Sequence, residues 1–483
     1  MSTPPPVLMI SVSGVRGLIG QTLTPHVATE FGQAFGTFLK TSAAGATGTP
    51  LTVAIGRDTR PSGPMIQFAV SAGLMSMGLH VVDVGIATTP SIALMGRFLK
   101  AHAAIVITAS HNPLIWNGIK FLRHDGIAYP PAQAAAIKQL FFDKPWLQAP
   151  PFTPSGLAGI DTLGLFSTDS RAHAHHVQTV LQFFDTRGIA ERRYKVVLDS
   201  VNGAGCIGTP MLTSKLGVEL FHMNKEANGQ FAHTPEPTRE NLVTLCDEVK
   251  RHRAAVGFAQ DPDADRLAIV DENGTYIGEE YTLALGTLAR LMVKPGPAVA
   301  NLSSSRMIDD VAARFGQKVY RTPVGEANVA GKMQEINAVI GGEGNGGIID
   351  LRVGPVRDSF LGIAMILDLL NRTNKTLSQL VAEIPHYTMI KTKFECTPNQ
   401  SATLVETVKK QYANQSGVTV DTQDGVRIDW PATGTGGDGG GGGGGGWVHV
   451  RQSNTEPIAR VIAEAKDEAT AHKLIDEVQK LRK

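Results

Sequence analysis

The chain has almost no net charge. Its 45 lysine and arginine residues balance 44 aspartate and glutamate residues, which leaves a formal charge of +1 at pH 7. Such a balance provides no general electrostatic attraction to nucleic acid or to an anionic membrane, so we expect neither partner. Any basic side chain that matters for function must therefore act locally, inside a binding site.

Cysteines and long apolar runs are also scarce. The three cysteines (Cys206, Cys246 and Cys396) are widely spaced and odd in number, which fits reduced thiols and not a disulfide framework. No stretch reaches the roughly 18 consecutive apolar residues that a membrane span needs. The first residues lack the cationic start and the apolar run of a signal peptide. These absences predict a cytoplasmic protein.

Length and patterning predict several domains, because 483 residues exceed what one hydrophobic core usually serves. Three short apolar runs each end in a polar turn and are followed by a helical pattern, a second strand and a Thr-Pro step. The runs are 51–55, 195–198 and 298–302, and the steps are 89–90, 234–235 and 322–323. This recurrence predicts the α/β class, with three related α/β/α domains of mixed sheets at 1–167, 168–276 and 277–385.

The last hundred residues have a different pattern, which predicts a C-terminal α+β domain at 386–483. Residues 387–396 alternate, 402–412 have helical spacing, 426–430 and 447–450 resemble paired strands, and 458–483 are rich in helix formers. Between the paired strands lies a glycine-rich insertion at 434–446, with eight consecutive glycines at 439–446. Such a tract gains nothing from ordering, so we expect a flexible loop.

Ser110 is the first candidate for chemistry. It follows the apolar run 103–107, which predicts a buried strand, and it stands in the polar run 108–113, TASHNP. A parallel α/β sheet presents functional groups at such strand ends. His111 is a candidate base for Ser110, although the G-x-S-x-G motif of hydrolases is absent. A serine in this position could also simply cap a helix or turn.

Three aspartates at alternate positions, Asp261, Asp263 and Asp265, form the second candidate. An EF-hand is excluded, because its sixth position must be glycine and here is Arg266, and because the flanks predict strands. In an extended segment the three carboxylates would share one face, where a hard cation such as Mg²⁺ would relieve their repulsion. A solvated turn and a phosphatase with an aspartate nucleophile are the alternatives.

Two more segments have the residue types of a sugar-phosphate site. Residues 341–347, GGEGNGG, place Glu343 and Asn345 among glycines, where a ligand can approach the backbone closely. Residues 451–457, RQSNTEP, follow a predicted strand, and Arg451 with the hydroxyls and amides after it could cradle a phosphate. Arg16, in the run 11–17, offers another guanidinium. A structural glycine turn, a helix start at Pro457 and an exposed turn arginine are the alternatives.

Taken together, these segments resemble the α-D-phosphohexomutase superfamily over essentially the whole chain. Within it the chain is most similar to the archaeal-type phosphoglucosamine mutases, on the runs SVSGVRG at 11–17, GEEYTL at 278–283, NLSSSR at 301–306 and GGEGNGG at 341–347. The resemblance implies four domains around a central cleft. It also implies a phosphomutase that interconverts 6-phosphates and 1-phosphates of hexosamines or hexoses, with glucosamine phosphate as the expected substrate.

The resemblance implies a role for each candidate residue. Ser110 would carry the phosphoryl group, and its oxygen together with Asp261, Asp263 and Asp265 would hold Mg²⁺. The predicted catalytic residues are Ser110, His111, Lys120, Arg16 and Arg266. The predicted substrate-binding residues are Glu343, Asn345, Thr322, Gly325, Arg451, Ser453, Asn454 and Thr455. The identity of the general acid and base stays open.

The implied mechanism passes through a sugar 1,6-bisphosphate, which also serves as activator. The enzyme would donate its phosphate to a small-molecule sugar phosphate, the bisphosphate would turn end over end, and Ser110 would take back the other phosphate. We expect the enzyme to be a monomer or a homodimer. Alternatives are a phosphoglucomutase/phosphomannomutase, a metal-dependent phosphatase, and a sugar-phosphate sensor without catalytic activity.

Overall fold

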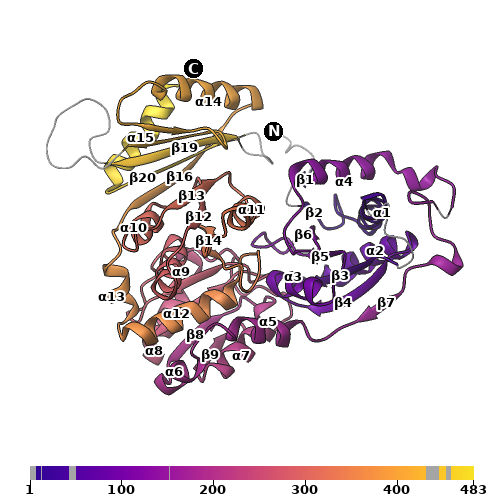
Figure 1. Cartoon of the computed structure of the whole chain (residues 1–483), viewed down its shortest axis with the longest axis horizontal. Helices are drawn as coiled ribbons and strands as arrows, with labels where there is room; N and C mark the ends of the chain where they lie inside the picture. Colours follow the sequence, from indigo (N-terminus) through magenta and orange to yellow (C-terminus); the bar gives the residue numbers. More distant parts are fainter. Residues whose placement is uncertain are drawn as a thin grey trace. The chain divides into compact units, whose positions relative to one another are not determined.

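The computed structural model describes residues 7–11, 14–42, 50–151, 153–430, 445–452 and 458–482. The chain divides into two compact units, whose helices and strands are labelled in Figure 1. Unit 1 comprises 1–282 and 346–379, and unit 2 comprises 283–345 and 380–483. None of the helices in these ranges combines the length and the apolarity that crossing a membrane requires.

Unit 1 begins with a mixed sheet of seven strands in the order β1-β2-β6-β5-β3-β4-β7. Its strands are β1 (Met9–Ser11), β2 (Gly14–Leu18), β3 (Thr52–Arg57), β4 (His80–Ile86), β5 (Ala103–Ile107), β6 (Trp116–Arg123) and β7 (Phe166–Thr168). Strand β3 is parallel to β4 and β5, whereas β6 is antiparallel to β5 and β2. The strands predicted at 51–55 and 103–107 are confirmed.

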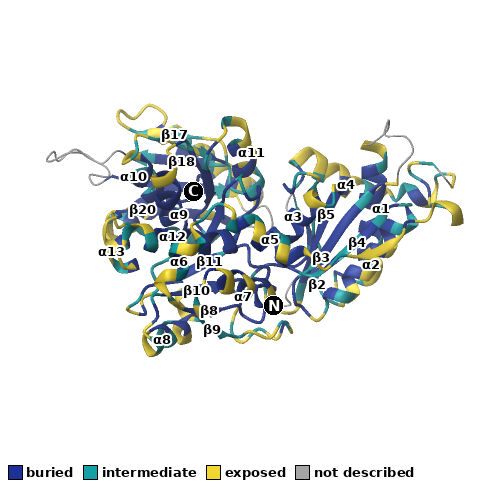
Figure 2. Cartoon of the chain, turned by 60° about the horizontal axis from the view of Figure 1, so that its bottom comes forward, coloured by how far each residue is buried: buried dark blue, intermediate teal, exposed yellow. Residues whose placement is uncertain are grey.

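Helices cover both faces of this sheet because its central strands are apolar on both faces. In β5, Ala103, Ile105 and Ile107 pack into the core beneath α1, α2 and α4, and Ala104 and Val106 pack into the core beneath α3. The helices are α1 (Pro25–Ser42), α2 (Gly63–Ser76), α3 (Thr89–Phe98) and α4 (Pro131–Asp143). Figure 2 shows the central strands in the colour of buried residues. The central strands are buried on both faces, and this explains why their sequences are continuous apolar runs.

The second sheet of unit 1 has four strands in the order β11-β10-β8-β9. They are β8 (Lys195–Asp199), β9 (Glu219–Met223), β10 (Val256–Gln260) and β11 (Leu267–Val270). The helices are α5 (Ala172–Leu181), α6 (Thr186–Arg192), α7 (Gly205–Lys215), α8 (Val243–His252) and α12 (Ser359–Thr373), and β15 (Gly347–Ile349) contacts α12. Strand β9 ends at Met223, so the Thr-Pro step at 234–235 lies well beyond it, contrary to the predicted repeat.

Unit 2 contains three parallel strands in the order β13-β12-β14. They are β12 (Ala298–Asn301), β13 (Val319–Thr322) and β14 (Ile340–Glu343). The associated helices are α9 (Glu279–Val293), α10 (Met307–Ala313), α11 (Glu326–Ile336) and α13 (Leu377–Ala382). The strand predicted at 298–302 is confirmed, and Thr322 closes β13 as the Thr-Pro step predicts.

The end of unit 2 is an antiparallel sheet in the order β16-β20-β19-β18-β17, with α14 and α15 against its core. Its elements are β16 (Thr388–Glu395), α14 (Pro398–Tyr412), β17 (Thr419–Asp421), β18 (Val426–Trp430), β19 (Gly446–Gln452), β20 (Ile458–Ala465) and α15 (Glu468–Lys480). The pairing of β18 with β19 is confirmed. Residues 431–444, most of the glycine-rich insertion, lie outside the described residues, and its last glycine, Gly446, belongs to β19.

One prediction for this domain is wrong. Residues 458–465 form the strand β20, although 458–483 were predicted to be rich in helix. Strand β20 pairs with β16 on one side and β19 on the other, and most of its side chains are buried. Ladder hydrogen bonds and burial on both sides outweigh the modest helix propensity of its alanines and its glutamate.

Candidate active site

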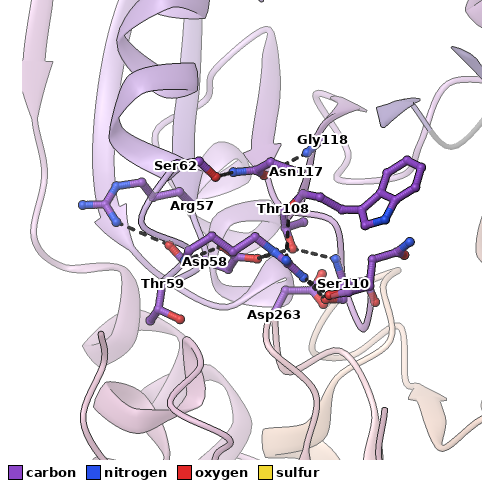
Figure 3. Close-up of polar contacts among 12 residues, drawn as sticks. Arg57, Asp58, Thr59, Ser62, Thr108, Ser110, Asn117, Gly118 and Asp263 are labelled. Atoms are coloured by element: carbon purple, nitrogen blue, oxygen red, sulfur yellow. Dashed lines mark hydrogen bonds and ion pairs between the residues drawn. The ribbon is translucent and has the colours of Figure 1, made fainter. Parts of the chain in front are cut away.

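Ser110 lies at the carboxyl end of β5 and is 2% exposed. Its backbone φ is +51°, a left-handed conformation that costs free energy in a residue other than glycine and that marks functional sites. Thr108 helps to hold this conformation, because its hydroxyl accepts a hydrogen bond from the Ser110 amide at 2.9 Å and donates one to Asp58 at 2.6 Å (Figure 3). The serine is thus presented on a constrained loop.

Arg60 lies beneath the same loop and is fully buried. Its guanidinium donates to the carbonyl oxygens of Ser110 and Asn112, both at 2.6 Å, and to those of Pro113 at 2.8 Å and Trp116 at 3.0 Å. Its Nε pairs with Asp58 at 3.0 Å, which balances the buried charge. One planar cation therefore satisfies four carbonyls of the serine loop at once, which the planar fork of arginine allows.

The three aspartates lie between β10 and β11, close to Ser110. Their ligand atoms lie within 4.8 Å of one another, and all three side chains are buried. The Ser110 hydroxyl donates to Asp261 Oδ2 at 2.9 Å. The loop is a turn and not the predicted extended segment, since Ala264 has φ +52°. The carboxylates nevertheless converge, because the turn folds their side chains toward one point.

Two neighbours hold Asp263. Lys120 Nζ donates to its Oδ2 at 2.8 Å, and the hydroxyl of Thr89 donates to the same oxygen at 2.6 Å. Burial alone would raise the pKa of Asp263, but the charge of Lys120 and the hydrogen bonds from Lys120 and its neighbours, including Thr89, together outweigh burial and lower the pKa. Burial and the adjacent carboxylates of Asp265 and Asp263 raise the pKa of Asp261 well above its usual range. The three acids therefore repel one another in a dry site.

The arrangement fits a hard divalent cation such as Mg²⁺. Asp263 Oδ1 and Asp265 Oδ1 are buried and accept no hydrogen bond from any residue that the structure describes. Leaving two carboxylate oxygens without a partner is costly unless a ligand satisfies them. The donors are all oxygen atoms, which suits Mg²⁺ better than zinc. Asp261, Asp263 and Asp265 are thus suited to hold the metal beside the Ser110 hydroxyl.

The other predicted catalytic residues of unit 1 lie near these acids. Lys120 Nζ is 3.8 Å from Asp265 Oδ2, and Arg266 Nε is 3.9 Å from Asp265 Oδ1. Burial lowers the pKa of Lys120, but the carboxylates of Asp263 and Asp265 outweigh burial and raise it. Arg16 donates to Asn112 Oδ1 at 3.1 Å. The structure therefore brings three cations together around the aspartates.

His111 Nδ1 lies 3.4 Å from the Ser110 hydroxyl, and its Nε2 lies 3.9 Å from Glu236. Burial, followed by the charges of Arg266 and Arg16, lowers the pKa of His111 to about 3. The imidazole is therefore neutral at physiological pH, and it is a weaker base than an ordinary histidine.

In unit 2, Glu343 ends β14 and is 5% exposed. Its Oε1 accepts from the side chain of Asn301 at 2.8 Å and from the amide of Gly325 at 3.1 Å, and Asn301 pairs with Thr322 in the sheet. Asn345 Oδ1 is buried and accepts no hydrogen bond from the described part of the chain. Arg451 lies at the end of β19. Ser453, Asn454 and Thr455 lie outside the described residues.

Sequence reasoning missed the residues that support these groups: Asp58, Arg60, Thr89, Arg357 and Asp424. Arg357 donates to Asp265 Oδ2 at 2.5 Å. Asp58, Arg60 and Thr89 follow the carboxyl ends of the parallel strands β3 and β4, the edge at which α/β sheets place their sites. That signal was available in the sequence, whereas nothing near Arg357 in the sequence relates it to an aspartate 92 positions earlier.

A serine, a histidine and an aspartate are linked by hydrogen bonds elsewhere in unit 1. Ser91 Oγ is 2.8 Å from His176 Nδ1, and His176 Nε2 is 2.7 Å from Asp358 Oδ2. All three residues are buried, with exposed fractions of 0 to 3%. A nucleophile must reach its substrate, so these hydrogen bonds serve to join α3, α5 and the start of α12.

The comparisons with known proteins cover all four parts of the chain. Its residues match the family descriptions phosphoglucomutase/phosphomannomutase, alpha/beta/alpha domain I at 9–147, domain II at 174–274, domain III at 279–387, and the C-terminal domain at 392–481. A phosphoglucomutase/phosphomannomutase of Thermococcus kodakarensis is 37% identical over 96% of both chains. The chain belongs to the phosphoglucomutase/phosphomannomutase family.

Two further relatives support this membership. A phosphoglucosamine/phosphogalactosamine mutase of Sulfurisphaera tokodaii is 32% identical over 98% of both chains. The crystal structure of a phosphoglucomutase/phosphomannomutase family protein of Burkholderia thailandensis has a TM-score of 0.80 and 25% identity, over 98% of this chain and 97% of that one. The predicted α/β class, with three α/β/α domains and a C-terminal domain, is thereby confirmed.

We predict that Arg60→Lys destabilises unit 1 and impairs the serine loop. A lysine keeps the charge but cannot bridge four carbonyls and Asp58, so the free energy of unfolding should fall by about 3 kcal/mol. The measurement is the denaturant midpoint of unfolding. Arg57→Lys is the matched control, because the hydrogen bond that the described residues give the Arg57 side chain is a long one, to the Asp58 carbonyl at 3.4 Å. Equal stability of the two variants would contradict the assigned role of Arg60.

Proposed function

We propose that this chain is a phosphomutase that interconverts the 6-phosphate and the 1-phosphate of a hexosamine or hexose through a phosphorylated Ser110. The observation that carries the proposal is the 2.9 Å contact between the Ser110 hydroxyl and Asp261, within a buried group of three carboxylates flanked by Lys120. A serine so placed is suited to give and take a phosphoryl group.

In the first step, a hydroxyl of the sugar phosphate attacks the phosphorus on Ser110. The new oxygen–phosphorus bond forms as the bond to Ser110 Oγ breaks and the proton of the attacking hydroxyl passes to Oγ, which yields a sugar 1,6-bisphosphate and free serine. Arg16, Lys120 and Arg266 are positioned to offset the negative charge of the moving group. After the bisphosphate has turned around, Ser110 attacks its other phosphorus and the isomeric monophosphate leaves.

Bound Mg²⁺ would neutralise negative charge on the phosphorylated serine. Asp261, Asp263 and Asp265 would hold the metal, together with the serine phosphate oxygen. The sugar 1,6-bisphosphate would serve as activator by phosphorylating enzyme that has lost its phosphate. His111 lies close enough to the serine hydroxyl to form a hydrogen bond. Because its pKa is low, His111 would be a neutral hydrogen-bond partner of that hydroxyl and would not carry an extra proton.

Substrate binding would involve residues of unit 2. Glu343 and Asn345 would grip sugar hydroxyls beside Thr322 and Gly325. Arg451, with Ser453, Asn454 and Thr455, would hold the phosphate that does not react. We propose glucosamine phosphate as the substrate, and the name of the Sulfurisphaera relative supports this choice. The alternative is glucose or mannose phosphate, which the name of the Thermococcus relative supports.

The three free cysteines of the chain support a reducing compartment, and we propose the cytoplasm. We expect a monomer or a homodimer, and light scattering distinguishes the two.

Ser110→Ala should abolish turnover while the fold and Mg²⁺ binding persist, because the substitution removes the phosphate acceptor and leaves the aspartates in place. The measurement is mutase activity with a sugar 1-phosphate, Mg²⁺ and the bisphosphate. Intact-mass analysis should find a fraction of wild-type chains one phosphate heavier, with the phosphate on Ser110. Mutase activity retained by the alanine variant would exclude the phosphoserine mechanism, and net release of inorganic phosphate by that variant would favour the phosphatase alternative.

Asp263→Asn should weaken Mg²⁺ binding and reduce turnover by orders of magnitude, because a hard cation prefers a charged oxygen. Calorimetric titration of Mg²⁺ gives the affinity independently of activity. Asp271→Asn is a matched control, since Asp271 is a buried aspartate of the neighbouring turn that lies outside the group of three. Full activity in excess chelator would refute the metal assignment.

The kcat/KM values for the 1-phosphates of glucosamine, glucose and mannose decide the substrate, measured with one bisphosphate and one Mg²⁺ concentration. We expect glucosamine 1-phosphate to have the highest value and the other two to be converted more slowly, by a modest factor. Asn345→Ala should lower kcat/KM equally for all three substrates, because it removes a hydrogen-bonding group that would bind a hydroxyl they share. A preference of about tenfold or more for glucose or mannose would favour the alternative substrates, although the mutase proposal would stand.

A further inference from the structure

Asp424 links two segments of unit 2 that are far apart in the sequence. Its Oδ2 accepts a hydrogen bond from Arg451 Nη1 at 2.9 Å and another from the amide of Val324 at 3.0 Å. Arg451 is the penultimate residue of β19, whereas Val324 follows β13 and lies between Thr322 and Gly325. One carboxylate oxygen therefore joins the predicted phosphate-binding arginine to the segment predicted to line the sugar.

The main chain of Asp424 is itself fixed. Gly425, the next residue, has φ +70°, and a Cβ there would lie 2.2 Å from the Val450 carbonyl oxygen, so the turn requires glycine. The Asp424 carbonyl lies 2.6 Å from His449 Nε2, and His449 Nδ1 lies 2.9 Å from the Ser303 hydroxyl. A carbonyl can only accept, so Nε2 donates to it.

His449 keeps this arrangement at physiological pH. It is fully buried, and burial lowers its pKa to about 4, so the ring is neutral. With the proton on Nε2, Nδ1 accepts from Ser303. The turn that carries Asp424 is thereby attached to the segment 301–306, which follows β12.

The same contacts continue to the predicted sugar-binding acid. The amide of Gly325, next to Val324, donates to Glu343 Oε1 at 3.1 Å, and Asn301 donates to the same oxygen at 2.8 Å. A series of hydrogen bonds and short backbone links thus connects Arg451 with Glu343 through Asp424. The groups predicted to hold the phosphate and the sugar belong to one connected network.

We infer that Asp424 is a positioning residue that fixes the guanidinium of Arg451 relative to the sugar-facing segment 322–325. An arginine held in place before the ligand arrives loses less rotamer freedom on binding than an unrestrained one. The bond to Asp424 uses one N–H of a guanidinium that has five. The inference rests on the proposed function for the identity of its ligand, a sugar monophosphate.

This role predicts a loss of affinity with little loss of rate. Arg451 would hold the phosphate that does not react, and such binding is the same in the ground state and the transition state, so its loss raises KM and leaves kcat nearly unchanged. Since either phosphate position of the sugar can occupy the same site, KM for the 1-phosphate and the 6-phosphate should rise equally.

The test compares Asp424→Asn, Arg451→Ala and the double variant with the wild-type chain. Calorimetry measures Kd for glucosamine 6-phosphate, and assays in both directions give KM and kcat. Asp424→Asn keeps an oxygen for the Val324 amide but removes the charge facing Arg451, so we expect Kd and KM to rise about tenfold, the size of one charge-assisted hydrogen bond. The double variant should be no weaker than Arg451→Ala alone, because Asp424 acts through Arg451.

Two further variants complete the test. Asp424→Glu retains the charge and should recover part of the affinity. Asp421→Asn removes a charge three residues away. Among the described residues the Asp421 carboxylate forms hydrogen bonds only with Gln423, so this variant should leave Kd within about twofold of the wild-type value. An unchanged Kd in Asp424→Asn, or effects of Asp424→Asn and Arg451→Ala that multiply, would overturn the inference.

The Kd series also separates this inference from the proposed function. A wild-type chain that binds the sugar phosphate but does not convert it would refute the mutase proposal, while the Kd values would still decide the role of Asp424. A wild-type chain that does not bind glucosamine 6-phosphate, glucose 6-phosphate or mannose 6-phosphate would overturn both.

Discussion

The buried pair of Asp58 and Arg60 is the interaction on which the serine site depends. It holds four carbonyls of the loop that follows β5, and through Thr108 it also fixes the amide of Ser110. A buried ion pair is seldom a net source of stability. Here its geometry has another consequence, because it keeps Ser110 in a left-handed conformation that the loop would otherwise leave. The hydroxyl is therefore directed at Asp261 before any ligand binds.

The aspartate loop is positioned from several segments at once. Thr89 at the start of α3 and Lys120 on β6 hold Asp263, and Arg357 holds Asp265, while Ser359 at the start of α12 donates to the carbonyl of Ala264 at 2.7 Å. These contacts leave one oxygen each of Asp263 and Asp265 without a hydrogen bond from the described residues. These contacts hold three buried carboxyl groups close together, where burial and the neighbouring carboxylates raise the pKa of Asp261.

The two units solve the same problem with different means. In unit 1 the guanidinium of Arg60 donates to backbone carbonyls of the loop that contains Ser110, whereas in unit 2 the carboxylate of Asp424 accepts a hydrogen bond from the guanidinium of Arg451. The Asp58–Arg60 pair is fully buried, whereas Asp424 and Arg451 are partly exposed.

The sequence by itself determined the class of fold, the strands β3, β5, β8, β12, β18 and β19, and the candidate residues Ser110, Asp261, Asp263 and Asp265. These follow from local patterns: apolar runs ending in polar turns, and carboxylates at short spacing. Only the tertiary structure decided that 458–465 is a strand, because the pairing of β20 with β16 and β19 comes from residues far away. The roles of Arg60, Arg357 and Asp424 were decided in the same way, since each acts on an atom brought near by folding, and local pattern contains no information about such distances.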